Sequence, residues 1–177
     1  MHVGRTALAG VLIIDPTVHR DERGFFLETY NAARFAQQGI TATFVQDNHS
    51  RSRRGTLRGL HWQQERPQGK LVRVIEGAIY DVAVDIQPAS PTFGRWIGVT
   101  ISADDFRQIY VPPGFAHGFC VVSDVAQVEY KCTALYDPAS ERGLIWNDPD
   151  VGITWPVTDP ILSERDKRHP RLAQLGR

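Results

Sequence analysis

The feature that most restricts the fold of this chain is a succession of short segments rich in β-branched and aromatic residues. Such residues favour strands, and the segments are separated by turn signals such as EGA (76–78), PASPTFG (88–94) and VPPGFAHG (111–118). The strand-like segments are 41–50, 55–63, 70–77, 78–86, 95–102, 107–112, 117–123 and 126–136. Short strands in this number and at near-regular spacing predict an all-β sandwich or barrel.

One short helix is expected near the N-terminus. In YNAARFAQQGI (30–40), Asn31 is a candidate N-cap and Gly39 a candidate stop, which predicts about two helical turns. The chain has 177 residues, enough to bury a sizeable core, and no repeat, low-complexity stretch or long linker divides it. We therefore expect a single domain over residues 1–177.

The charge balance excludes several classes of partner. Lys+Arg and Asp+Glu both number 20, so the chain lacks the basic field that nucleic acids and anionic lipids attract. No apolar run approaches the roughly 18 residues of a membrane span, and the start MHVGRTALAGVLIIDP does not read as a signal peptide. We expect a cytoplasmic protein with no nucleic-acid or membrane partner. Cys120 and Cys132 lie in apolar-rich segments without CxxC spacing, which favours buried thiols over a disulfide or a zinc site.

Alternation along the strands predicts which side chains face the interior. Tyr130 shares a face with Val128 and Cys132, and Lys70 shares a face with Val72. An inward lysine is unusual, because lysines are almost never fully buried without a partner. Asp81, in the next strand-like segment, is one candidate partner.

A histidine in LRGLHWQ (57–63) is a third inward candidate. His61 and Arg58 fall on opposite faces of a regular strand, but a bulge at Gly59 would bring both to one side. A single inward histidine or tyrosine is more often a core residue than a catalyst. Three ionisable groups converging from separate strands are costly to bury without a function, and this convergence favours a site.

The residue types argue against a metal. VPPGFAHGF (111–119) contains P-x-G-x-x-H, ending at His117, and resembles the second signature motif of the cupin superfamily. The first cupin motif supplies two histidines one residue apart, whereas this chain has His61 and then Gln63. Because an amide is a poor ligand for zinc or iron, we expect no functional metal.

The motifs together resemble the dTDP-4-dehydrorhamnose 3,5-epimerase family along nearly the whole chain. They are DERGFFLETY (21–30), FVQDNHS (44–50), LRGLHWQ (57–63), GKLVRV (69–74), DVAVDI (81–86), SPTFGRW (90–96), VPPGFAHGF (111–119), EYKCTALYDP (129–138) and IWNDPDVGITWP (145–156). The resemblance implies a cupin-type jelly-roll barrel, a homodimer, a dTDP-4-keto-6-deoxyhexose substrate and no metal or organic cofactor.

The resemblance also implies roles for individual residues. His61 would be the base, Asp166 would hydrogen-bond its ring, Tyr130 would be the acid on the opposite face, and Lys70 would steady charge on the sugar O4. From sequence alone, Asp166 looks like a solvated charge. Contacts to the nucleotide and phosphates would come from Arg23, Glu28, Gln46, Asn48, Arg58, His117, Glu141 and Arg165.

Three departures from the family pattern leave alternatives open. Leu135 stands where a second tyrosine is common, five residues beyond the acid, and Arg165 stands where a lysine is usual. The loop QERPQG (64–69) is also short. A missing active-site aromatic would favour an epimerase that inverts only C3 or only C5. A metal-dependent cupin oxygenase would need a ligand in place of Gln63, and a non-catalytic sugar-nucleotide binder would have no use for His61, Tyr130 and Asp166 together.

Overall fold

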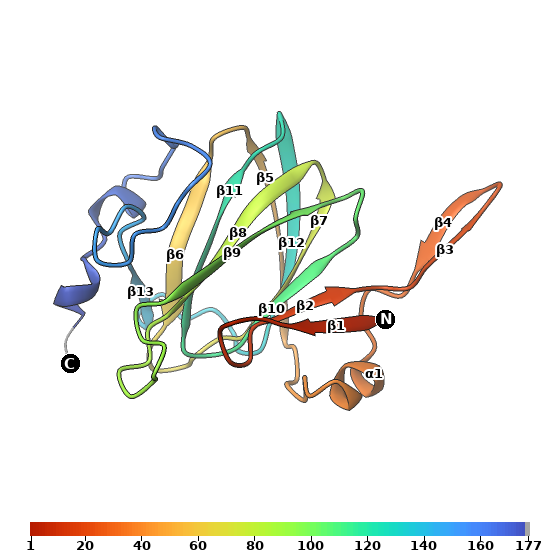
Figure 1. Ribbon diagram of the computed structural model, residues 1–177, viewed down its shortest axis with the longest axis horizontal. Coiled ribbons are helices and arrows are strands. Elements are labelled where there is room, and N and C mark those ends of the chain that lie inside the picture. Colours follow the sequence, from red (N-terminus) through yellow and green to blue (C-terminus); the bar gives the residue numbers. More distant parts are fainter. Residues whose placement is uncertain (176–177) are drawn as a thin grey trace.

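The computed structural model describes residues 1–175 and consists mainly of two antiparallel sheets (Figure 1). The six-stranded sheet has the order β1 (His2–Arg5), β2 (Leu12–Asp15), β10 (Gln108–Val111), β7 (Lys70–Glu76), β12 (Val125–Cys132) and β5 (Gln46–Arg53). The five-stranded sheet has the order β13 (Glu141–Gly143), β6 (Leu57–Gln63), β11 (Phe115–Val121), β8 (Ala78–Asp85) and β9 (Trp96–Ser102). The expected all-β architecture is confirmed.

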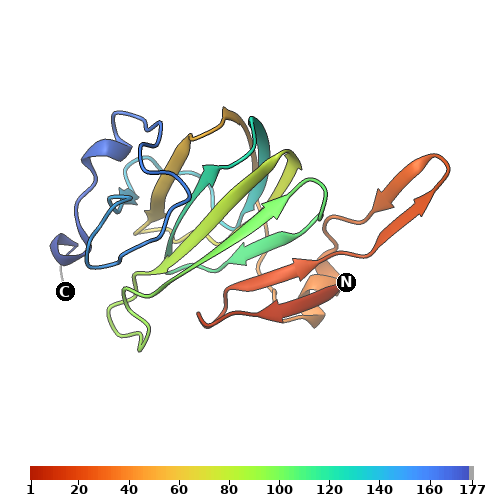
Figure 2. The same cartoon turned by 45° about the horizontal axis from the view of Figure 1, so that its top comes forward.

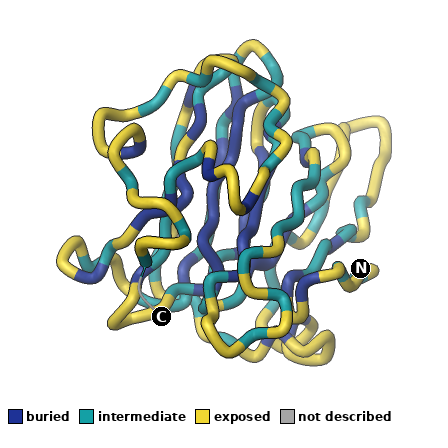
Figure 3. The backbone as a smooth tube through the Cα atoms, turned by 60° about the vertical axis from the view of Figure 1, so that its left-hand side comes forward, coloured by how far each residue is buried: buried dark blue, intermediate teal, exposed yellow. Residues whose placement is uncertain are grey.

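The two main sheets lie against each other as the layers of a jelly roll (Figure 2). Within residues 1–175, no strand of one sheet pairs with a strand of the other, so the structure is a sandwich rather than a hydrogen-bonded closed barrel. Apolar side chains from both layers, among them Val72, Val128, Ala83 and Phe119, form the main core. Figure 3 shows that the buried stretches are concentrated in the central strands.

The predicted helix is present, and the N-terminal strands were missed. Helix α1 spans Ala32–Gln37, and the Asn31 side chain accepts a hydrogen bond from the Arg34 backbone at 3.2 Å. Gly39 follows with a φ of 89°, a left-handed conformation that suits glycine. The four strands before residue 41 have only four residues each, too few for alternation to be recognised.

Two of these short strands form an arm. Strands β3 (Val18–Asp21) and β4 (Gly24–Leu27) pair only with each other and project from the body of the molecule (Figure 1). Phe25 and Phe26 on this arm are exposed. The prediction for segment 41–50 is wrong in its first half, because β5 begins only at Gln46.

The C-terminal part contributes two short 3₁₀ turns, η1 (Asp166–Arg168) and η2 (Leu172–Gln174). They lie beside the five-stranded sheet, on the side away from the arm (Figure 1). The buried Asp148 side chain accepts a hydrogen bond from the Leu172 backbone at 2.6 Å and so anchors this segment. No helix within residues 1–175 is long and apolar enough to cross a membrane.

Candidate active site

A cavity of about 410 Å³ opens between the two sheets. The six-stranded sheet supplies Lys70 and Tyr130, as alternation predicted, and the five-stranded sheet supplies His61. Ten of the twelve predicted site residues line this cavity: Gln46, Asn48, Arg58, His61, Lys70, His117, Tyr130, Glu141, Arg165 and Asp166. The strands therefore bring together groups that are far apart in the sequence.

A bulge in β6 places Arg58 and His61 on the same wall. His61 pairs with His117 across the sheet and Arg58 pairs with Phe119, so two residues of β6 lie opposite one residue of β11. The extra residue shifts the alternation and turns both side chains into the cavity. Gly59 lies in the bulge with a φ of 122°, and an added Cβ would lie 2.6 Å from the Gly118 Cα. The predicted bulge at Gly59 is confirmed.

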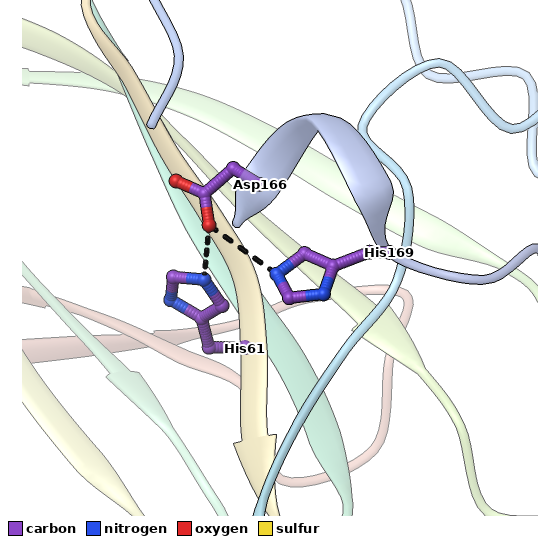
Figure 4. Close-up of side chains that lie close together, drawn as sticks. All are labelled: His61, Asp166 and His169. Carbon is purple, nitrogen blue, oxygen red and sulfur yellow. Dashed lines mark hydrogen bonds and ion pairs between the residues drawn. The ribbon is translucent and has the colours of Figure 1, made fainter. Parts of the chain in front are cut away.

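His61 and Asp166 form a hydrogen-bonded pair. The His61 Nε2 lies 2.6 Å from the Asp166 Oδ1, although the two residues are 105 positions apart (Figure 4). Burial raises the pKa of Asp166, but hydrogen bonds from His169 and His61 outweigh this effect and hold the pKa well below its usual range. Because Asp166 is then an ionised acceptor, the His61 Nε2 must carry the proton. The remaining ring nitrogen, Nδ1, is left as a base.

Burial also lowers the pKa of His61. The Asp166 carboxylate opposes this effect, and the charge of Lys70 adds to it. The imidazole is therefore neutral in the neutral pH range, which is the form that can accept a proton.

A second histidine, His169, was not predicted from the sequence. Its Nε2 lies 3.2 Å from the same Asp166 Oδ1, so two imidazoles share one carboxylate oxygen (Figure 4). His169 follows Asp166 by three residues across the turn η1, and this spacing in DKRHP was the only available signal.

The His61, Asp166 and His169 side chains also form a candidate metal cluster, since their ligand atoms lie within 4.8 Å of one another. Two ligands at about 2.1 Å from a tetrahedral ion would be about 3.4 Å apart, well above the 2.6 Å between His61 and Asp166. This spacing fits a direct hydrogen bond. Gln63 is buried, and its amide is used by the backbone: it donates to Arg66 and Leu135 and accepts from Asp137.

Lys70 lines the cavity but is not hydrogen-bonded to Asp81, the partner that the sequence suggested. Its Nζ donates to the His61 carbonyl oxygen at 3.4 Å. Asp81 instead accepts hydrogen bonds from the His117 Nε2 at 2.9 and 3.0 Å, because β8 neighbours β11 rather than β7. Burial lowers the pKa of Lys70, although nearby negative groups oppose the effect. The ammonium group is therefore a stronger proton donor than a solvated lysine.

Tyr130 faces the cavity from β12, opposite the sheet that carries His61. Burial raises the pKa of its phenol. The hydroxyl therefore stays protonated at neutral pH and can donate.

Two of the three departures from the family pattern, at Leu135 and Arg165, are explained by the positions of the side chains. Leu135 is 59% exposed and does not line the cavity, whereas Tyr136 does line it. The Tyr136 hydroxyl donates to the Glu141 Oε2 at 2.8 Å, and the Arg165 guanidinium contacts the same oxygen. The concern that an active-site aromatic had been lost is therefore wrong.

Polar groups from β5 line the rest of the cavity. The Gln46 amide donates to the Asn48 Oδ1 at 3.0 Å, and Arg58 donates to the Ser52 hydroxyl at 3.0 Å. Ser50, which was not predicted, is also in the wall. Within residues 1–175, its Oγ is the one buried side-chain polar atom with no hydrogen-bond partner. A buried hydroxyl that lines a cavity and lacks a hydrogen-bond partner in the protein is a candidate for a hydrogen bond with a ligand.

Arg23 and Glu28 do not reach this cavity. Arg23 lies at the exposed tip of the β3–β4 arm, bonded to Asp21, and Glu28 pairs with Arg34 beside α1. In a single chain, the two predicted contacts are thus separated from the other ten.

Cys120 and Cys132 are both buried and free, as expected. Burial raises the pKa of both thiols, to about 11 for Cys120. Neither is an activated thiolate.

Comparison with known proteins shows the family. The family model for dTDP-4-dehydrorhamnose 3,5-epimerase matches residues 5–174. The dTDP-4-dehydrorhamnose 3,5-epimerase of Methanothermobacter thermautotrophicus is 54% identical over 173 residues, which cover 96% of this chain and 94% of that protein. The Escherichia coli protein of the same name is 51% identical over 180 residues, which cover 100% and 97%.

Solved structures agree. The 3,5-epimerase of Legionella pneumophila, in complex with dTDP-4-keto-L-rhamnose, superposes with a TM-score of 0.96 at 46% identity and covers 99% of this chain and 94% of that chain. A 3'-monoepimerase of Streptomyces bikiniensis with dTDP-quinovose gives a TM-score of 0.89 at 35% identity, with 95% and 86% covered. The chain belongs to the dTDP-4-dehydrorhamnose 3,5-epimerase family, and the expected class of enzyme, a dTDP-sugar epimerase, is confirmed.

Proposed function

We propose that this chain inverts C3 and C5 of a dTDP-4-keto-6-deoxyhexose by removing and returning protons through an enolate. The observation that carries the proposal is the placement of His61, supported by Asp166, and Tyr130 on opposite walls of one cavity. Inverting a carbon centre requires a base on one face and an acid on the other, and this arrangement supplies both.

The C4 ketone makes the two neighbouring carbons acidic, because loss of a proton gives an enolate with its charge on O4. His61 accepts the proton at Nδ1, and the ionised Asp166 stabilises the imidazolium that forms. Lys70 faces the developing charge on O4 with an ammonium group of lowered pKa. Tyr130 then delivers a proton to the opposite face.

The nucleotide end is assigned to the polar wall. Arg58 offers a planar fork to the pyrophosphate, and Gln46 and Asn48 offer amides beside it. His117 and Arg165 line the same space and complete the predicted contacts. A local cluster of this kind explains how a chain of zero net charge holds an anionic substrate.

Two centres are favoured over one by Tyr136 and by the relatives. The aromatic side chain that Leu135 cannot supply is present in the cavity as Tyr136. The 3,5-epimerases of Methanothermobacter thermautotrophicus and Escherichia coli are 54% and 51% identical to this chain. The dTDP-4-dehydrorhamnose 3-epimerase of Streptomyces niveus is 39% identical.

We further propose a homodimer in which the β3–β4 arm of each chain serves the cavity of its partner. The arm exposes Phe25 and Phe26 and carries Arg23 at a distance from its own cavity. Large exposed aromatics are typical of interfaces. Light scattering on the purified protein should give twice the chain mass, and replacing both phenylalanines with serine should give the monomer mass.

The proposed reaction is tested by incubation with dTDP-4-keto-6-deoxyglucose in D₂O. We expect one deuterium at C3 and one at C5, counted by mass spectrometry and NMR, and an inverted product. Deuterium at a single carbon would identify a single-centre epimerase. No deuterium at either carbon would indicate a non-catalytic sugar-nucleotide binder.

We also propose that the reaction needs no metal. Activity should survive exhaustive treatment with a chelator. The Gln63 amide is hydrogen-bonded to backbone groups, and Asp166 is hydrogen-bonded directly to His61. Activity lost to the chelator and restored by one transition metal would contradict this.

A further inference from the structure

Two imidazoles donate hydrogen bonds to the same carboxylate oxygen, Oδ1 of Asp166. The Asp166 Oδ1 lies 2.6 Å from the His61 Nε2 and 3.2 Å from the His169 Nε2. The two rings meet edge to face, with centroids 5.3 Å apart and an interplanar angle of 82° (Figure 4). Because the Asp166 carboxylate can only accept hydrogen bonds when ionised, both nitrogens must carry protons that point to it.

The fold makes specific room for the His169 ring. Gly143 of β13 pairs with His61 of β6, and a Cβ added at Gly143 would lie 2.2 Å from the His169 Cε1 and Nδ1. The imidazole therefore packs directly on the backbone beside the base. The Ile145 backbone donates to the Pro170 carbonyl at 2.9 Å, which fixes the chain immediately after His169.

We propose that His169 is a positioning residue for the epimerisation, which acts by holding the Asp166 Oδ1 in line with the His61 ring. The proposal rests on the proposed function, in which His61 is the base. His169 is outside the set of residues that line the cavity, so it acts through its contacts with Asp166 and the His61 ring and not through the substrate.

The second hydrogen bond has two physical effects on the pair. It fixes the carboxylate, because Asp166 is held by His61, His169 and its own backbone, whose N–H donates to the Ser163 hydroxyl at 3.1 Å. It also satisfies part of the negative charge on Oδ1, so that the carboxylate supports the His61 imidazolium less strongly. Removing the His169 donor should therefore loosen the base and make it more basic.

The sign of the pH effect follows from the groups that face His61. Asp166 on η1 and Glu141 on β13 favour the imidazolium, and Lys70 on β7 disfavours it. His169 faces Asp166 and the His61 ring from the segment after η1. Since His61 acts as a base in its neutral form, a higher pKa of His61 moves the acidic limb of the kcat/KM profile to higher pH.

The test compares three single variants with the wild-type enzyme. His169→Phe keeps the ring volume and removes the donor, His169→Gln keeps an amide donor, and Leu172→Ala loosens the same segment without touching the pair. We expect His169→Phe to lower kcat about threefold to tenfold, the effect of one hydrogen bond, and to move the acidic limb to higher pH. His169→Gln should largely restore both, and Leu172→Ala should leave the limb in place.

Several results would overturn the proposal. The proposal fails if His169→Phe leaves both kcat and the acidic limb unchanged. It also fails if Leu172→Ala shifts the limb as much as His169→Phe does, or if His169→Gln does not restore the wild-type values. Gly143→Ala provides a second route, because its methyl group displaces the His169 ring, and it should shift the limb as His169→Phe does. Circular dichroism melts check that each variant is folded.

An NMR measurement on the wild-type protein does not depend on any variant. With ¹⁵N-labelled imidazoles, the His169 Nε2 should carry a proton at neutral pH, and a proton on Nδ1 alone would overturn the proposal. If the wild-type enzyme incorporates no deuterium into the sugar, the proposed function fails instead, whatever tautomer His169 has.

Discussion

Two His–Asp pairs flank the same cavity, and they differ in what each histidine is free to do. In one, His61 is bonded to Asp166 at 2.6 Å, and the His61 side chain is 21% exposed. In the other, His117 is bonded to both oxygens of Asp81 at 2.9 and 3.0 Å, with side-chain exposures of 7% and 0%. The same two residue types are thus built into an accessible pair and a buried pair.

The difference lies in what holds each carboxylate. Asp81 is in the middle of β8, and β11 with His117 is its neighbour in the sheet, so both partners are fixed by ladder hydrogen bonds. Asp166 is in a single 3₁₀ turn outside the sheets, and it is held by hydrogen bonds to two histidines and by its backbone N–H, which donates to the Ser163 hydroxyl. The accessible pair therefore has its carboxylate outside the strand ladders, and its histidine is the more exposed of the two. We infer that the buried pair shapes the cavity and the accessible pair moves the proton.

The largest expected effect is that of removing the base. His61→Ala should lower turnover by about 10²–10⁴, the contribution of a positioned general base. Exchange of the C3 and C5 hydrogens with D₂O should fall together with inversion, because both need abstraction. The control is His49→Ala, an exposed histidine on β5. Near-normal exchange in His61→Ala would remove His61 from the role of base and end the contrast between the two pairs.

Tyr130→Phe should separate two steps that His61→Ala removes together. The phenyl ring keeps the packing against the main core, and abstraction by His61 is spared, whereas delivery from the opposite face is lost. Inversion should fall about 10²-fold or more, while deuterium exchange continues faster than inversion. If the variant inverts the sugar at the wild-type rate, another group is the acid, and Tyr136 is the next to test because its hydroxyl lines the same cavity.

Exchanging each aspartate for asparagine compares the two pairs directly. Asp166→Asn should lower kcat about 10–100-fold, less than loss of His61, because the base remains but its ring is no longer held by a charge. Asp81→Asn should act mainly on stability, at about 1–3 kcal/mol, because it leaves the buried His117 with a weaker partner. The measurements are kcat and the thermal unfolding of both variants. If both variants lost the same fraction of kcat and were equally stable, the two pairs would have the same role in the reaction.

Sequence patterns predicted those parts of the site that depend on strand faces. Alternation placed Tyr130 and Lys70 inside, and Gly59 marked the bulge that turns His61 and Arg58 to one wall. The partner of Asp81 was predicted wrongly, because alternation assigns a face but does not say which strands are neighbours. The β5 wall was predicted only in part: the family motif FVQDNHS (44–50) indicated Gln46 and Asn48, but Ser50 at its end was not singled out.

The C-terminal contribution could not be predicted from local patterns. Asp166 lies 105 residues from His61 and in a turn, where no periodicity gives a direction, so only the family resemblance indicated it. His169 had no such support, and its role depends on the space left by Gly143 in a three-residue strand. Four-residue strands hid the β3–β4 arm for a related reason, because they are too short to show a period.

The smallest expected effect concerns Ser50, whose hydroxyl is hydrogen-bonded to neither His–Asp pair. Its Oγ is buried in the cavity wall without a hydrogen-bond partner among residues 1–175, while its neighbours Gln46 and Asn48 bond each other. A substrate group that pairs with this hydroxyl would contribute binding energy but take no part in proton transfer. Ser50→Ala should therefore raise KM about threefold to tenfold, the value of one hydrogen bond, and leave kcat and the deuterium exchange ratio unchanged. Ser102→Ala is the matched control, because the Ser102 hydroxyl accepts a hydrogen bond from the Asp105 backbone and does not line the cavity. A fall in kcat without a change in KM in Ser50→Ala would place this hydroxyl with the accessible His–Asp pair, and the division of the cavity into a wall that binds and a pair that moves protons would have to be redrawn.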